Sequence, residues 1–180
     1  MSDSDFEQRL AAFCADRFGG GEDVSALRRL SGGANMESWA FDYGGRGMVL
    51  RRLPEGMAER GGDAASVAAI SLATQAKLIE LARERGVVAP EVLARLQESD
   101  GLGTGFVMAR VEGETLPHKI LDNRDFAQAE KRLCDQCAEQ LAAIHVIPPD
   151  QAPDEIRTAG AETLLAEQER AYREIGGAIP

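Results

Sequence analysis

The amino-terminal segment places apolar residues at the spacing of a helix with one buried face. Four apolar side chains recur three or four positions apart: Phe6, Leu10, Phe13 and Cys14. Ser4 can cap this helix, and three glycines follow Phe18, where a helix would end. We therefore expect an amphipathic helix over residues 4–18.

Shorter runs of apolar, aromatic and β-branched residues predict strands after this helix. Five such runs cover residues 24–30, 37–43, 47–53, 91–96 and 105–109. Gly44 and Gly45 separate the second run from the third, and a turn over residues 99–101 separates the last two. The spacing predicts five strands, of which the first three are antiparallel.

One helix is expected between the third and fourth strands. Residues 54–65 are rich in glycine, charge and small side chains, which is typical of a loop. A helix over residues 66–85, ended by Gly86, would follow this loop. Its apolar positions share one face: Val67, Ile70, Ala73 or Thr74, Leu78 and Leu81. This face would pack against the sheet.

Every segment after residue 114 is helical in pattern. The longest helix is expected over residues 124–145, with Asp122 or Asn123 as its cap. Its buried face would comprise Phe126, Leu133, Cys137, Leu141 and Ile144. A last helix over residues 161–175 would turn inward Leu164, Leu165, Gln168, Tyr172 and Ile175. The whole pattern predicts an α+β fold: a five-stranded antiparallel sheet with one inserted helix, followed by helices.

Composition narrows the classes of partner. The chain has 180 residues, of which 44% are hydrophobic, enough to bury one full core. Its net charge of −10 would repel nucleic acid and anionic membrane surfaces, so neither is expected as a partner. No apolar run is long enough to cross a bilayer and the first residues lack a secretory signal, so a cytoplasmic location is expected.

Cysteines and histidines offer little metal or redox chemistry in this sequence. Cys134 and Cys137 form a C-x-x-C pair, but the pair lies inside a helical pattern and lacks a second Cys or His pair at ligand spacing. His118 and His145 are too far apart in sequence to form a local ligand pair. We expect core or surface cysteines, structural histidines with satisfied hydrogen bonds, and no metal site.

A turn of small residues joins the first two predicted strands. It comprises Ser31, Gly32, Gly33, Ala34 and Asn35. Adjacent glycines let backbone N–H groups approach an anion without obstruction by side chains, and Ser31 and Asn35 add polar groups. The turn could thus lie over phosphates. On spacing alone, an ordinary hairpin turn remains the alternative.

Five segments in a fixed order carry a resemblance to a known family. They are LSGGAN (30–35), VLRR (49–52), GVVAPEVL (86–93), GFVMARVEGE (105–114) and LAAIH (141–145). Together with the five strands and the inserted helix, they resemble the amino-terminal lobe of the kinase-like fold, and more specifically the aminoglycoside phosphotransferase and choline kinase group. The resemblance covers about residues 24–147.

The resemblance implies a nucleotide site. By position, residues 31–35 would cover the nucleotide phosphates, and Arg51 stands where the family often has a phosphate-contacting lysine. Gln75 stands where an acidic residue would orient that cation, so an ion pair is lost. Met108 would lie at the back of the adenine pocket, and the backbones of Ala109 and Val111 would read the adenine edge.

The resemblance also implies cofactors and a domain organisation. ATP and Mg²⁺ would be the cofactors, and a small molecule with a hydroxyl group would be the acceptor. Residues 1–22 would form an amino-terminal helix, residues 23–113 the nucleotide-binding lobe, and residues 114–180 the helical start of a truncated carboxy-terminal lobe.

Two segments that this chemistry needs are missing. The family's His-Gly-Asp segment, with its catalytic aspartate, does not occur, and no later aspartate matches the one that holds Mg²⁺. Four other aspartates are expected to be solvated surface residues: Asp122, Asp125, Asp135 and Asp154. The sequence therefore predicts an incomplete, inactive fragment of a small-molecule kinase.

Two other functions stay open. A non-catalytic module could use the kinase-like lobe to bind a partner, or to dimerise through the exposed apolar faces of helices 124–145 and 161–175. A generic α+β domain, in which the glycine turn binds nothing, is the third interpretation. Nucleotide binding would exclude this last one.

Overall fold

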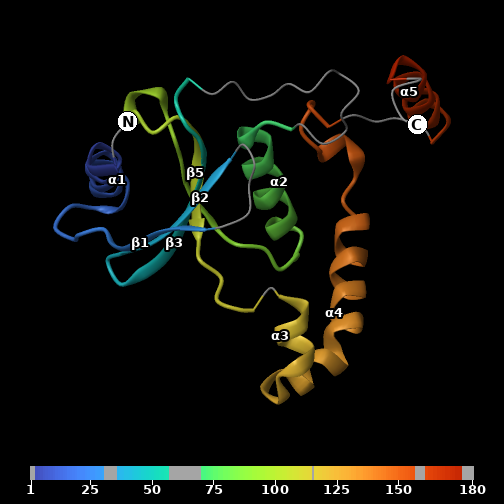
Figure 1. Ribbon diagram of the computed structural model, residues 1–180, viewed down its shortest axis with the longest axis horizontal. Coiled ribbons are helices and arrows are strands. Elements are labelled where there is room, and N and C mark those ends of the chain that lie inside the picture. The colour runs from blue at the N-terminus through green and yellow to red at the C-terminus, as the bar shows by residue number, and fades with distance from the viewer. Residues whose placement is uncertain (1–2, 31–35, 57–69, 115, 157–160, 176–180) are drawn as a thin grey trace.

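The computed structural model describes residues 3–30, 36–56, 70–114, 116–156 and 161–175. Its centre is a five-stranded antiparallel sheet in the order β1-β2-β3-β5-β4 (Figure 1). The strands are β1 (Ser25–Leu30), β2 (Glu37–Tyr43), β3 (Arg46–Leu53), β4 (Val92–Arg95) and β5 (Thr104–Ala109). The α+β fold with five antiparallel strands and one inserted helix is as predicted.

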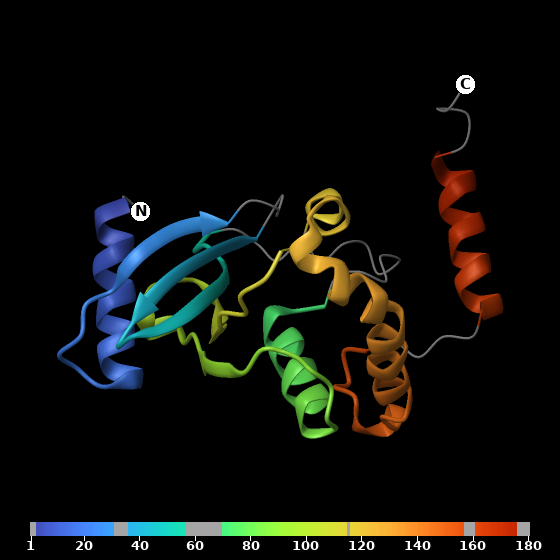
Figure 2. The same ribbon diagram turned by 90° about the horizontal axis from the view of Figure 1, so that it is seen from below.

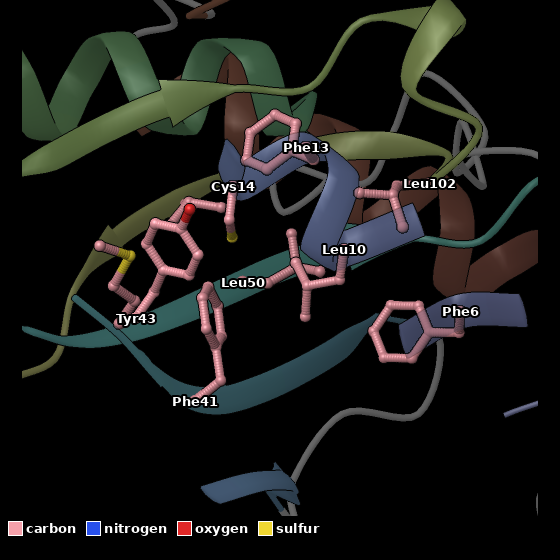
Figure 3. Packing of buried hydrophobic residues seen from close by; sticks show 10 residues of the cluster. Phe6, Leu10, Phe13, Cys14, Phe41, Tyr43, Leu50 and Leu102 are labelled. Atoms are coloured by element: carbon pink, nitrogen blue, oxygen red, sulfur yellow. The ribbon is translucent and has the colours of Figure 1, made fainter. Parts of the chain in front are cut away.

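Helix α1 (Asp3–Phe18) covers one face of the sheet. Its four predicted apolar residues are buried, and they meet Phe41, Leu50 and Val107 of three strands (Figure 3). Because side chains alternate between the faces of a strand, residues at every second position of β3 reach this helix. The larger described core cluster thus lies between α1 and the sheet.

The β2–β3 hairpin turns at Gly44 and Gly45. Both have positive φ, 56° and 72°, the left-handed conformation that a two-residue turn between right-twisted strands requires. Tyr43 pairs with Arg46 directly beside the turn. The two glycines thereby set the register of β3 against β2.

Helix α2 (Leu72–Glu84) covers the opposite face (Figure 2). Its predicted start was wrong, and its predicted buried face was correct at Thr74 but not at Leu78 and Leu81. Ser71 is the N-cap, and its Oγ accepts a hydrogen bond from the Thr74 amide at 3.1 Å. Residues 66–69 lie outside the described part. The helix buries Leu72, Thr74 and Ala76, whereas Leu78 and Leu81 are only half-buried. Because the helix starts at Leu72, the face that packs against Leu53 and Phe106 is formed by Leu72 and Ala76.

Three helices follow the sheet: α3 (Pro117–Asp122), α4 (Ala127–His145) and α5 (Ala161–Ile175). The sequence did not predict α3 as a separate helix. The start of α4 was also predicted too early, because Arg124–Phe126 forms a 3₁₀ turn capped by the Asn123 side chain. Helix α4 lies beside α2, and the Gln140 side chain accepts a hydrogen bond from the Val88 amide at 2.7 Å (Figure 2).

The predicted buried faces of α4 and α5 were wrong. Leu133, Leu141 and Ile144 of α4 are 48%, 52% and 45% exposed, and Leu165 and Tyr172 of α5 are each 70% exposed. Helix α5 lies away from the sheet in both views (Figures 1 and 2). Periodicity identified the apolar stripes correctly, but no described segment covers them. Among the described helices, none is long and apolar enough to cross a membrane.

Candidate functional site

Arg51 lies in β3 on the face of the sheet that α2 covers. It stands opposite Ser38 of β2 and Phe106 of β5, and Phe106 packs in the core under α2. Its Nη2 contacts the Met36 sulfur at 3.6 Å. Its Nε is buried and has no hydrogen-bond partner among the described residues. A buried N–H without an acceptor is costly, and an anionic oxygen is the acceptor that a guanidinium binds best.

Met108 lies on the same face as Arg51, on the neighbouring strand β5. It stands opposite Val49 of β3 and Val92 of β4, two positions along the sheet from the Arg51–Phe106 pair. Its half-buried side chain packs against the core under α2. The antiparallel register thus brings the predicted phosphate-contacting cation and the predicted adenine-pocket residue to one face.

The segment after Met108 leaves the sheet through two backbone hydrogen bonds. The Ala109 amide donates to the Glu91 carbonyl at 2.8 Å, and the Arg110 amide donates to the Gly47 carbonyl at 2.9 Å. The side chain of Val111 is 73% exposed. Ala109 is therefore held at the end of the sheet, whereas Val111 belongs to the connector.

A salt bridge that sequence reasoning missed holds this connector. Arg110 Nη1 lies 2.7 Å from Asp42 Oδ1 of β2, and its Nε also donates to Glu112. The hydrogen bond with Glu112 and, to a smaller extent, that with Asp42 raise the pKa of Arg110 above its usual value. The alternating charges of Arg110 and Glu112 are a sequence signal, but Asp42 is near them only because β2, β3 and β5 are adjacent.

Gln75 lies in the first turn of α2 and is half-buried. Its side-chain amide donates to the Ile70 carbonyl at 3.2 Å. It is neutral, so it cannot form the ion pair that an acidic residue would make with Arg51. The contacts of Gln75 with Ile70 and of Arg51 with Met36 do not join the two side chains.

The predicted glycine turn, residues 31–35, lies outside the described residues, so its five site residues are not placed. Its two flanks are placed. Leu30 at the end of β1 pairs with Ser38 in β2, and Ser38 pairs with Arg51 in β3. The turn therefore joins the strands at the end of the sheet where Arg51 lies.

A buried ion pair on the opposite face was also missed by sequence reasoning. Arg52 is 4% exposed, and its Nη2 lies 2.8 Å from Glu37 Oε2. Burial raises the pKa of the Glu37 carboxyl, but hydrogen bonds from Trp39 and Arg52 and the positive charges of Arg52 and Arg29 outweigh it, so the pKa lies below its usual value. Strand alternation is the signal that could have placed Arg52 in the interior.

The amino-terminal end of α2 binds a carboxylate from the carboxy-terminal part of the chain. Glu155 Oε2 accepts hydrogen bonds from the Ser71 hydroxyl at 2.8 Å and the Ser71 amide at 3.3 Å. Hydrogen bonds from Thr74 and Ser71 lower the pKa of Glu155 below its usual value. The exposed N–H groups of a helix start favour such a negative charge. This contact ties residues 153–156 to α2.

The described residues contain no group of three or more His, Cys, Asp or Glu side chains arranged to hold a metal ion. The four aspartates considered above are all exposed: Asp122, Asp125, Asp135 and Asp154. The described residues thus offer no ready-made cluster that would hold Mg²⁺ by itself.

The histidines and cysteines lie mostly at the surface. His118 and His145 are exposed. Cys134 and Cys137 are exposed on α4, and Cys14 is buried in the core. Burial raises the pKa of the Cys14 thiol to about 12, so this thiol stays protonated at neutral pH.

Two of the cavities on the described surface are lined by neither Arg51 nor Met108. One, of about 410 Å³, lies between α2 and residues 151–155. The other, of about 430 Å³, lies at the end of β3 beside residues 96–98.

Comparisons with known proteins identify a family. A family model described as "Phosphotransferase enzyme family" matches residues 26–176. The crystal structure of aminoglycoside phosphotransferase APH(4)-Ia is similar, with 24% identity and a TM-score of 0.48 over 78% of this chain and 40% of that one. A thermostable mutant of that enzyme, in ternary complex with AMP-PNP and hygromycin B, has 25% identity and a TM-score of 0.47 over 77% and 39%. The chain thus spans about 40% of the length of these structures. No curated protein sequence matches it.

Proposed function

The chain belongs to the phosphotransferase enzyme family, and we propose that it forms the nucleotide-binding part of an ATP-dependent kinase that phosphorylates a hydroxyl group of a small molecule. Arg51 carries this proposal. It is a permanent cation on the face under α2, and its buried Nε has no hydrogen-bond partner among the described residues. A nucleotide phosphate oxygen would satisfy that N–H.

The remaining site residues have distinct roles in this proposal. Residues 31–35 bind phosphate oxygens through backbone N–H groups, and Arg51 binds them through its guanidinium. Met108 packs against the adenine ring, and the backbones of Ala109 and Val111 hydrogen-bond its edge. Gln75 is neutral, so it gives Arg51 no carboxylate partner, and the nucleotide phosphates supply anionic oxygens for the guanidinium. ATP supplies the phosphoryl group that is transferred.

We further propose that this chain by itself binds nucleotide without transferring the phosphoryl group. The sequence contains no His-Gly-Asp segment to activate an acceptor hydroxyl. The described residues contain no cluster suited to Mg²⁺. In this proposal, residues 23–113 form the nucleotide-binding lobe and residues 114–180 form the helical start of the carboxy-terminal lobe.

Nucleotide binding is tested by the thermal stability of the chain in the presence of ATP with Mg²⁺, ADP and adenosine, since a ligand that binds only the folded state raises Tm. We expect ATP to raise Tm and Arg51→Gln to reduce the rise. Arg46→Gln is the matched control, because Arg46 lies on the same strand in an exposed pair with Glu91 at 3.8 Å.

Equal ATP responses in Arg51→Gln and the wild type would remove Arg51 from the site. The absence of any response to ATP in the wild type would contradict the proposed function. A rise in Tm with sulfate equal to that with ATP would show a general anion site and would also contradict it.

A second candidate function is a non-catalytic module that dimerises. One observation favours it: Leu133, Leu141 and Ile144 form an exposed apolar stripe on α4. Sedimentation velocity of the chain tests it. We expect a concentration-dependent dimer that Leu141→Glu abolishes, with Glu139→Gln as an exposed control on the same helix. A monomer at all concentrations would exclude this candidate.

A further inference from the structure

Glu37 and Arg52 stand directly opposite each other on β2 and β3. The carboxylate oxygen Oε2 of Glu37 accepts hydrogen bonds from Arg52 Nε at 2.9 Å and from Trp39 Nε1 at 3.0 Å, and it also lies 2.8 Å from Arg52 Nη2. The side chains of Arg52 and Glu37 are only 5% and 17% exposed. Removing either partner would leave a largely buried charge, so this pairing strongly favours one geometry.

Two further elements hold Arg52. The ring of Phe6 in α1 lies 4.1 Å from its guanidinium carbon and 4.7 Å from the Trp39 ring. On the other side, Arg52 Nη1 donates to the Leu102 carbonyl at 3.2 Å. The guanidinium therefore joins β3 to β2, to α1 and to the turn before β5. Lysine, with a single flexible ammonium group, could not make all these contacts.

The position of this pair links it to the candidate phosphate site. The pair of Glu37 with Arg52 is next in register to the pair of Ser38 with Arg51. Successive side chains of a strand point to opposite faces, so Arg52 is held under α1 while Arg51 faces α2. Glu37 is also the first residue of β2, just after the predicted glycine turn. One ion pair thus joins β3, the strand that carries Arg51, to the beginning of β2.

We propose that Arg52 is a positioning residue of the phosphate site: its contacts with Glu37, Leu102 and Phe6 hold the β3 backbone from which Arg51 reaches the phosphates. This inference rests on the proposed function. Arg52 makes no contact with the nucleotide in this proposal. Loss of the Arg52 contacts should weaken the binding of phosphates more than the binding of the base and ribose, because the adenine contacts come from β5 and the connector.

The test is calorimetric titration of ATP with Mg²⁺ and of adenosine into the wild type, Arg52→Lys and Phe6→Leu. Arg52→Lys keeps the charge and loses the planar hydrogen bonding, and Phe6→Leu keeps both charges and loses the ring. We expect each variant to raise the Kd for ATP about tenfold, the size of one charge-assisted hydrogen bond, and to change the Kd for adenosine less than twofold.

Arg29→Lys is the matched control, since Arg29 also approaches Glu37, at 3.4 Å, but is 58% exposed. It should change neither Kd. The ratio of the two Kd values is decisive, because general destabilisation would weaken ATP and adenosine binding alike. An unchanged ratio in the folded variants, with ATP binding intact in the wild type, would overturn this inference alone. A wild type that binds no ATP would overturn the proposed function as well.

Discussion

Arg51 and Arg52 are neighbours in β3, yet their guanidinium groups have opposite surroundings. Arg52 is engaged by a carboxylate, a carbonyl and an aromatic ring, whereas the buried Nε of Arg51 has no partner among the described residues. Alternation along a strand separates the two faces. A fully satisfied arginine stabilises the fold, and an unsatisfied one is a candidate for ligand binding.

At this scale, the Glu37–Arg52 pair predicts a pH dependence of stability. The pKa of Glu37 in the folded state lies below the ordinary value of 4.5, so the folded state favours the charged carboxylate. The contribution is complete above about pH 4.5 and is lost as the pH falls through the lower pKa of the folded state. Glu37→Gln should therefore give a flatter fall in the free energy of unfolding below pH 4.5 than the wild type.

At neutral pH the same variant should lose stability. We expect Glu37→Gln to lower the free energy of unfolding by about 2–3 kcal/mol, less than a fully buried pair would cost because the carboxylate is partly exposed. Urea unfolding at several pH values measures both effects. If the free energy of unfolding of the variant falls with decreasing pH as steeply as that of the wild type, the pair of Glu37 with Arg52 is not the cause of the pH dependence.

Among the elements, the close contact of β3 and β5 depends on glycine at one position. Gly105 stands opposite Arg52, and a Cβ there would lie 2.2 Å from the Arg51 carbonyl oxygen. The neighbouring atoms belong to the backbone, so they cannot rotate away. From the sequence, Gly105 was only the start of a predicted strand. The pairing of β3 with β5 shows why a residue without a side chain is required at this position.

Gly105→Ala should therefore destabilise the protein by about 1–3 kcal/mol, the usual cost of overpacking. Gly113→Ala is the control, since a Cβ at Gly113 meets nothing within 4 Å. Thermal unfolding of both variants tests this. Equal Tm values for the two would mean that β3 and β5 separate without cost at this point.

Over the whole molecule, the larger described core cluster lies between α1 and the sheet, so we expect this region to contribute most to the free energy of unfolding. Leu10 of α1 is fully buried, whereas Leu165 of α5 is 70% exposed. Leu10→Ala should cost about 2–5 kcal/mol through lost burial and a cavity. The same substitution at Leu165 should stay within about 0.5 kcal/mol. Chemical unfolding of the two variants makes the comparison, and a large loss at Leu165 would show that α5 packs against another surface in solution.

The sequence by itself determined most of the elements and their order, but not α3. Periods of two and of about 3.6 residues depend only on local geometry, so the five strands, α1 and the apolar stripe of α4 could be read from residue spacing. The segments that carry the family resemblance were likewise present in the sequence. These segments predicted Arg51 and Met108 as site residues, and the strand register of the structure then placed both on the face of the sheet under α2.

Only the tertiary structure decided which of these surfaces are covered and which charges meet. The face that α2 buries followed from its start at Leu72, and the stripe of α4 stayed exposed because no described element packs on it. Glu37 with Arg52, Asp42 with Arg110 and Glu155 with Ser71 are pairs from distant segments. Such contacts depend on how elements pack against each other, which residue spacing along one element does not encode.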